Sequence, residues 1–212
     1  MKSNKVLLPF GKTIYQSSDG HSVTSDTAAL VNKILEDNKE KDLSLLDLGS
    51  GNGIISIMLK YYQNSWKCTG LEIQEKLVNM AIKNARKTNL EVAFINGDLR
   101  NYNWKDRKFD IIASNPPYIK FKQGRTSPNQ ERAISRQEIC CQMTDILQVI
   151  KNQLKNNGNA YLIYPESRSL ELRKTTKKID LIILEKFILA DKIVKCIFVI
   201  AKRRDKKHKN LK

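Results

Sequence analysis

The chain has 212 residues, of which 41% are hydrophobic and 28% charged, a composition that excludes collagen, wholesale disorder and mucin-like stalks. This length fits one compact domain. The formal net charge of +16, from 38 Lys and Arg against 22 Asp and Glu, predicts a polyanionic partner, with nucleic acid ahead of a membrane surface. An alternative is that abundant Lys and Asn partly reflect the base composition of the gene.

Targeting and metal signals are absent from the sequence pattern. No apolar run approaches the ~20 residues that span a bilayer, and the apolar stretch before Pro9 is too short for a signal peptide. The cysteines Cys68, Cys140, Cys141 and Cys196 contain no CxxC pair and, with two histidines, no zinc spacing. We therefore expect a cytoplasmic monomer with reduced thiols, no metal and no membrane contact.

Strand and helix patterns alternate along most of the chain. The first 40 residues are expected to form an extension, with a helix that begins at Thr24 or Ser25 and ends near Asp37. Strands are then expected at 44–48, 66–73, 91–95, 108–114, 158–164, 181–189 and 193–202, and helices from 54, over 75–88 and over 132–154.

This alternation predicts an α/β fold, a Rossmann-like doubly wound, mostly parallel sheet covered on both faces. The short turn at 190–192 makes the last two strands antiparallel, so one strand near the edge is reversed. The expected organisation is an extension over 1–40, a main domain over 41–202 and a basic tail over 203–212.

Polar and glycine residues follow three successive strands. The first set is the turn Asp47-Leu48-Gly49-Ser50-Gly51-Asn52-Gly53, where glycines allow a sharp turn and close approach of a ligand. Glu72, in Gly70-Leu71-Glu72-Ile73, is suited to accept two ribose hydroxyls, and Asp98, before Leu99, can accept from an adenine amino group. Together they predict a site for a nucleotide-like cofactor.

These residues resemble the class I S-adenosylmethionine-dependent methyltransferases. The resemblance implies that the glycine turn meets the methionine part of S-adenosylmethionine, Glu72 the ribose and Asp98 the adenine, with Ile73 and Leu99 also in contact with the cofactor. It also implies a seven-stranded sheet with a reversed last strand. A dinucleotide dehydrogenase is the competing interpretation, which is disfavoured because the turn reads DxGxGxG and not GxGxxG.

The stretch Ser114-Asn115-Pro116-Pro117-Tyr118 follows the fourth strand of this main domain. An aromatic amine or an amide is a poor nucleophile because its lone pair is delocalised. The Asn115 oxygen and the Pro116 carbonyl can accept its two N–H bonds, Pro117 keeps that carbonyl free, and Tyr118 can stack on the planar target. Positioning and electrostatics then suffice, without an acid, a metal or a covalent nucleophile.

This motif is similar to those of amino and amide N-methyltransferases. SNPPYI also occurs in the glutamine N5-methyltransferases of peptide release factors. The segment 120–138, with its Asn129, Arg132-Ala133 and Arg136-Gln137-Glu138, resembles the bacterial tRNA1(Val) adenine-37 N6-methyltransferases, although Gln137 replaces a histidine of that pattern. RNA adenine N6-methylation is the expected function, with protein glutamine methylation as the alternative and a non-catalytic nucleic-acid-binding module as the third possibility.

Two further groups of residues are assigned from this family resemblance or from charge. The resemblance implies that the segment 16–26 closes over the cofactor, with Gln16 and Thr24 in contact, and Asn115 is expected to face cofactor and substrate alike. Basic residues expected to grip tRNA phosphates are Lys120, Lys122, Arg125, Arg132, Arg136, Lys202, Arg203 and Arg204. The alternative for Arg132 and Arg136, four residues apart, is a solvated helix face.

Overall fold

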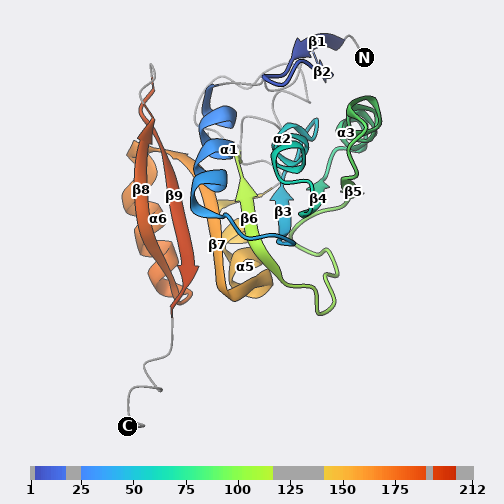
Figure 1. Cartoon of the computed structure of the whole chain (residues 1–212). Coiled ribbons are helices and arrows are strands. Elements are labelled where there is room, and N and C mark those ends of the chain that lie inside the picture. Colours follow the sequence, from blue (N-terminus) through green and yellow to red (C-terminus); the bar gives the residue numbers. More distant parts are fainter. Residues whose placement is uncertain (1–2, 18–24, 117–140, 190–192, 204–212) are drawn as a thin grey trace, which may run out of the picture.

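The computed structural model describes residues 3–17, 25–116, 141–189 and 193–203. They form a hairpin of two strands and a seven-stranded sheet with the order β5-β4-β3-β6-β7-β9-β8 (Figure 1). The strands are β1 (Ser3–Leu7), β2 (Thr13–Ser17), β3 (Ser44–Leu48), β4 (Lys67–Glu72), β5 (Ala93–Asn96), β6 (Phe109–Ser114), β7 (Leu154–Pro165), β8 (Leu181–Leu189) and β9 (Lys195–Lys202). The helices are α1 (Ser25–Asp37), α2 (Ile54–Tyr62), α3 (Glu75–Thr88), α5 (Met143–Gln153) and α6 (Ser169–Lys178), with a 3₁₀ turn η1 (Glu166–Arg168).

The sheet has the expected topology. Strands β5, β4, β3, β6 and β7 are mutually parallel, whereas β9 is antiparallel to both of its neighbours, β7 and β8. The prediction of a Rossmann-like, mostly parallel seven-stranded sheet with one reversed strand is therefore confirmed. The reversed strand β9 lies one position in from the edge, because β8 pairs along its outer side.

Helices cover both faces of the sheet, and successive strand residues alternate between the two cores. Leu45 and Ile111 join the cluster that contains α1 and α2, whereas their neighbours Leu46 and Ile112 join the cluster that contains α5 and α6. This period of two is what a strand buried on both faces requires. The described helices include none long and apolar enough to cross a bilayer.

Some elements differ from the expectations. The β1–β2 hairpin was not expected, because its first strand is largely exposed and shows little apolar alternation. Helix α6 was also missed, since its sequence SLELRKTTKK buries only Leu172 and Thr176. Strand β7 begins at Leu154 and not at 158, directly after α5 ends at Gln153. The expected start of that helix at 132 falls outside the described residues.

Candidate active site

The predicted residues Asp47, Glu72, Asp98 and Asn115 lie along one edge of the sheet, the one formed by the carboxyl ends of its parallel strands. Because β5, β4, β3 and β6 are adjacent and parallel, their carboxyl ends meet there (Figure 1). Two side chains join these ends: the Ser114 hydroxyl donates to the Leu48 carbonyl at 2.7 Å, and the Asn96 amide donates to the Glu72 and Ile73 carbonyls, each at 3.0 Å. Together with the pairing of β3 and β4, these hydrogen bonds hold the four strand ends side by side.

The glycine turn after β3 needs glycine for conformation and for space. Gly49, Gly51 and Gly53 have φ values of 70°, 55° and 83°, in the left-handed region that side chains disfavour. A Cβ on Gly53 would also lie 2.5 Å from the Phe94 ring, whereas a Cβ on Gly49 or Gly51 would meet no atom within 4 Å. The turn thus packs tightly at its helix end and faces open space at its start.

Glu72 is fixed by backbone donors at the end of β4. One carboxylate oxygen accepts from the Gly51 amide at 3.0 Å, and the other accepts from the Gln74 amide at 2.9 Å. Burial raises the pKa of this carboxyl, while the two amides oppose the shift. A carboxylate has about four acceptor positions, so two hydrogen bonds leave capacity for a ligand's hydroxyls.

Asp47 is fully buried at the end of β3 and only half satisfied. Its Oδ2 accepts from the Ser56 hydroxyl at 2.9 Å, whereas its Oδ1 has no hydrogen-bond partner among the described residues. The Ser50 hydroxyl in the adjoining turn is buried and lacks a partner in the same set. Burial raises the pKa of Asp47 to about 7, and the charge of Glu72 adds to the shift. Such orphaned polar atoms are expected where a polar ligand completes a site.

Asp98, which is expected to contact the adenine, already accepts hydrogen bonds from Arg100. The Arg100 side chain donates from Nε to both of its carboxylate oxygens at 3.0 Å, and this pairing lowers the pKa of Asp98. The Arg100 backbone amide also donates to Asp98 at 3.0 Å. An amino group of a ligand would therefore share this carboxylate with Arg100. Leu99, next in the chain, is half-buried and Ile73 is exposed at 37%.

Asn84 of α3 is a site-forming residue that the sequence analysis missed. Its amide donates to the carbonyls of Tyr15 and Asn52 at 2.9 and 3.0 Å, and its Oδ1 accepts from the Tyr15 amide at 2.7 Å. These bonds hold β2, and with it the half-buried Gln16, beside the glycine turn. The available signal was a polar residue on the apolar face of the helix, three residues after Ala81.

The expected catalytic and RNA-contacting residues are only partly described. Asn115 is half-buried and Pro116 buried, directly after β6. The residues that lie outside the described part of the chain are Pro117, Tyr118, Thr24, Lys120, Lys122, Arg125, Arg132, Arg136 and Arg204.

The two described basic candidates near the C-terminus are not brought to this edge. Lys202 and Arg203 lie at and just after the end of the reversed strand β9, at the opposite edge of the sheet from Asn115. Burial and the charges of Lys108 and Lys151 lower the pKa of Lys202. Any RNA contact there would therefore be separate from the candidate active site. No group of three or more potential metal ligands occurs among the described residues.

The sequence matches a known protein family over most of its length. Residues 39–177 match the family described as "Methyltransferase domain". A release factor glutamine methyltransferase of Streptococcus pneumoniae is 37% identical over 94 residues, which cover 44% of this chain and 33% of the relative. A tRNA1(Val) (adenine(37)-N6)-methyltransferase of Glaesserella parasuis is 31% identical over 152 residues, which cover 70% of this chain and 63% of the relative. The chain thus spans between a third and two thirds of these relatives.

Solved structures share the fold. The 16S rRNA N2 G1207 methyltransferase of Thermus thermophilus, solved with AdoMet and guanosine, has a TM-score of 0.68 at 16% identity and covers 96% of this chain and 50% of its own. A methyltransferase of Pyrococcus furiosus has the same TM-score at 18% identity and covers 92% of this chain and 91% of its own.

Proposed function

The chain belongs to the methyltransferase domain family, and from this premise we propose that it is an S-adenosylmethionine-dependent N-methyltransferase that acts on the N6 amine of an adenine in RNA. The first candidate target is adenine 37 in the anticodon loop of tRNA1(Val). The observation that carries the proposal is the alignment of four strand ends, which brings the half-satisfied Asp47, the anchored Glu72 and Asn115 to one edge.

The residues at this edge fit S-adenosylmethionine, which supplies the methyl group. The orphaned Oδ1 of Asp47 and the open space at Gly49 and Gly51 suit its amino acid part. The free acceptor positions of Glu72 suit the ribose hydroxyls, and Asp98 with Leu99 suits adenine. A ligand ammonium near Asp47 would favour the ionised carboxylate, whose pKa burial raises to about 7.

Asn115 and Pro116 are the residues proposed to act on the target amine. An aromatic amine is planar and its lone pair is delocalised, so a nucleophilic nitrogen must become more tetrahedral. The Asn115 side-chain oxygen and the Pro116 carbonyl would accept its two N–H bonds and favour that geometry. The bond from Ser114 to the Leu48 carbonyl fixes the end of β6 and so the start of this motif.

RNA is favoured over protein as the substrate by charge. The net charge is +16, and electrostatic attraction of Lys and Arg to phosphates dominates nucleic-acid affinity. The extent of similarity favours neither substrate, since the tRNA enzyme of G. parasuis covers 70% of this chain and a release factor glutamine methyltransferase of Buchnera aphidicola covers 76%. The second candidate, glutamine N5-methylation of a release factor, is favoured by the 37% identity to the release factor enzyme of S. pneumoniae. A non-catalytic binding module leaves Asp47, Glu72 and Asn115 unexplained.

The organisation of the chain is part of the proposal. We propose an N-terminal extension over 1–40, a methyltransferase domain over 41–202 and a basic tail over 203–212. The core cluster that joins Leu8, Ile14 and Leu30 to Leu45 and Ile57 supports an extension that packs on the main domain.

Labelled S-adenosylmethionine tests the substrate directly. The full chain is incubated with hypomodified tRNA or with an unmethylated release factor, and the products are analysed by nucleoside and peptide mass spectrometry. We expect N6-methyladenosine in the tRNA and no label in the protein. Asn115→Ala is the control and should give neither product. Label in a release factor glutamine would overturn the RNA assignment, and label in neither, with intact cofactor binding, would overturn both.

A further inference from the structure

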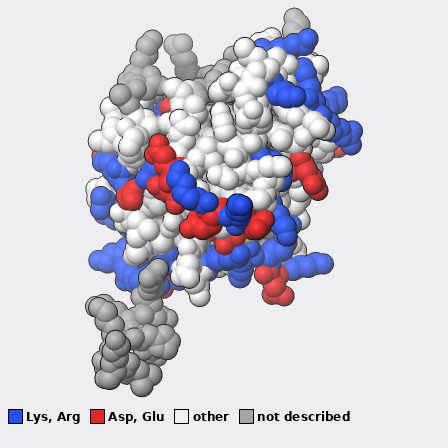
Figure 2. Space-filling view, in the orientation of Figure 1, with Lys and Arg blue, Asp and Glu red and all other residues white. Residues whose placement is uncertain are grey.

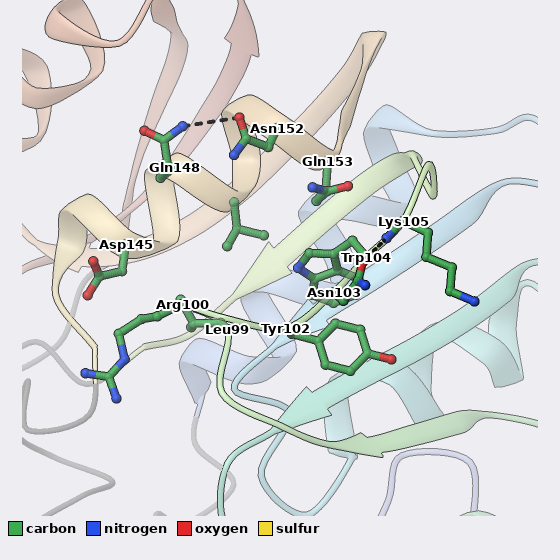
Figure 3. Close-up of a pocket in the computed structure, with 11 residues that line it drawn as sticks. Leu99, Arg100, Tyr102, Asn103, Trp104, Lys105, Asp145, Gln148, Asn152 and Gln153 are labelled. Carbon is green, nitrogen blue, oxygen red and sulfur yellow. Dashed lines mark hydrogen bonds between the residues drawn. The ribbon is translucent and has the colours of Figure 1, made fainter.

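A pocket of about 290 Å³ lies between the loop that follows β5 and helix α5 (Figure 3). The loop contributes Leu99, Tyr102 and Trp104, and the helix contributes Gln148, Asn152 and Gln153. Neither the glycine turn nor Glu72 lines it. The pocket therefore adjoins the candidate cofactor site and shares Leu99 with it, and its volume is at the small end of the range for ligand sites.

Two of the lining residues each carry a buried polar atom that lacks a hydrogen bond within the described part of the chain. Trp104 is 6% exposed and Gln153 is 9% exposed, and neither the indole Nε1 of the first nor the Oε1 of the second has a partner among the described residues. Both side chains line the pocket. Leaving a buried donor or acceptor unpaired is unfavourable and uncommon, so a group within the pocket that both accepts and donates is the expected complement.

We propose that this pocket binds an unpaired nucleobase of the RNA substrate, an inference that rests on the proposed function. A nucleobase edge offers an acceptor next to an N–H donor, which complements the Trp104 indole and the Gln153 carbonyl. The Gln148 and Asn152 side chains add further amides, and Tyr102 adds an aromatic ring. Proteins recognise single-stranded RNA by this combination of aromatic surface and base-edge hydrogen bonds.

Cations at the same end of α5 suit the phosphates of such a nucleotide. The Lys108 ammonium donates to the carbonyl of Asn152, a pocket residue, and Lys151 is the neighbouring residue in the helix. Burial lowers the pKa of Lys202, and the nearby charges of Lys108 and Lys151 lower it further. Lys105 stands on the loop side of the pocket, whereas the Arg100 side chain is paired with Asp98. Figure 2 shows Lys and Arg side chains along the lower border of the molecule, the edge at which β9 ends.

The chain's two tryptophans provide the test. Trp66 is buried elsewhere and its indole Nε1 donates to the Glu40 carbonyl at 3.0 Å, whereas the Trp104 indole is unpaired among the described residues. A ¹H–¹⁵N spectrum of the full chain therefore has two indole signals, which Trp104→Phe assigns. The probes are the four nucleoside 5′-monophosphates and a single-stranded RNA of about 17 nucleotides, each added with S-adenosylhomocysteine at saturation so that the cofactor site is occupied.

We expect the RNA to shift the Trp104 signal and leave the Trp66 signal unchanged. Trp104→Phe and Gln153→Met should each weaken RNA binding roughly threefold to tenfold, as loss of one hydrogen bond implies. Trp66→Phe is the matched control, since it removes a buried indole that belongs to the other core cluster and does not line the pocket, and it should not alter RNA affinity. Each variant is checked by its unfolding midpoint, so that lost binding is separated from lost structure.

Three results would overturn the inference. The first is a Trp104 signal that RNA does not move. The second is a shift with mononucleotides but not with RNA, which would assign the pocket to a free nucleotide. The third is a pair of folded variants that bind RNA normally, which would show that the RNA contacts neither polar atom. If the protein methylates RNA but RNA does not shift the Trp104 signal, the nucleobase site is rejected and the proposed function stands. If RNA shifts the signal but is not methylated, the proposed function is rejected and the nucleobase site stands.

Discussion

Replacement of Asp47 by asparagine should have opposite effects on stability and on cofactor binding. The carboxyl is fully buried, and its pKa rises from 3.8 to about 7. A raised acid pKa means that the group's contribution to folding is fully present below the unfolded value, 3.8, and is lost as the pH rises toward 7. This pKa difference corresponds to a loss of at most roughly 4 kcal/mol in the free energy of unfolding at alkaline pH.

Asparagine carries no charge and can still accept from Ser56, whose hydroxyl lies 2.9 Å from Asp47 Oδ2. Its amide N–H groups would be buried without partners, at a cost of roughly 1–3 kcal/mol. The net expectation for Asp47→Asn is a gain of about 1–3 kcal/mol in the free energy of unfolding at pH 8, and a loss near pH 4. Urea denaturation of the unliganded chain at the two pH values measures the difference.

The same variant should bind S-adenosylhomocysteine at least tenfold more weakly at pH 8, because the anionic acceptor for the ligand's ammonium is gone. In the wild type this affinity should rise with pH through about 7, as the carboxylate forms. Calorimetry across that range checks it, with Ser56→Ala as a control that keeps the charge. Equal destabilisation of Asp47→Asn at both pH values, together with unchanged affinity, would refute the reasoning.

Four further outcomes are expected. Glu72→Ala should weaken S-adenosylhomocysteine binding tenfold or more by calorimetry, since two charged hydrogen bonds of ~1.5 to 3 kcal/mol each are at stake; unchanged affinity would remove Glu72 from the site. Asn115→Ala should depress single-turnover rates far more than cofactor affinity, and near-normal rates would reject its role. Gly70→Ala should destabilise the fold by about 1–3 kcal/mol in urea, because its Cβ would lie 2.6 Å from the Phe94 ring. Truncation after Lys202 should flatten the slope of log RNA affinity against log salt by up to ~4, with turnover at saturating RNA unchanged. An unchanged slope would show that the tail does not contribute to RNA binding.

The parts of the fold predicted well are those whose pattern is dictated by burial. Strands covered on both faces, such as β3 (SLLDL) and β6 (FDIIAS), are short segments in which most residues are apolar. Helix α3 keeps a clear apolar stripe and was predicted at Glu75–Thr88, its observed bounds. By contrast, α6 and the β1–β2 hairpin bury few side chains, so their sequences lack the periodicity that would mark them.

The residues of the candidate site likewise fall into those that the sequence predicts and those that depend on tertiary packing. Residues at the carboxyl ends of strands follow from chain order, because parallel strands place them at one edge, and Asp47, Glu72 and Asn115 were predicted in this way. Asn84 depends on the docking of a hairpin 69 residues away in sequence, which no local pattern encodes. The orphaned indole of Trp104 likewise arises from tertiary packing against α5.

The three hydrogen bonds of Asn84 also constrain the order in which the chain can mature during synthesis. Tyr15 is synthesised 69 residues before its hydrogen-bond partner Asn84. At 5–20 residues per second this separation corresponds to a delay of roughly 3–14 s. In that interval β2 has no partner on α3, and Ile14, wholly buried in the finished protein, is open to solvent or to a chaperone. Docking of the hairpin on α3 therefore cannot be completed before residue 84 has been synthesised, and a nascent chain halted before residue 84 should be cleaved by protease near its amino terminus.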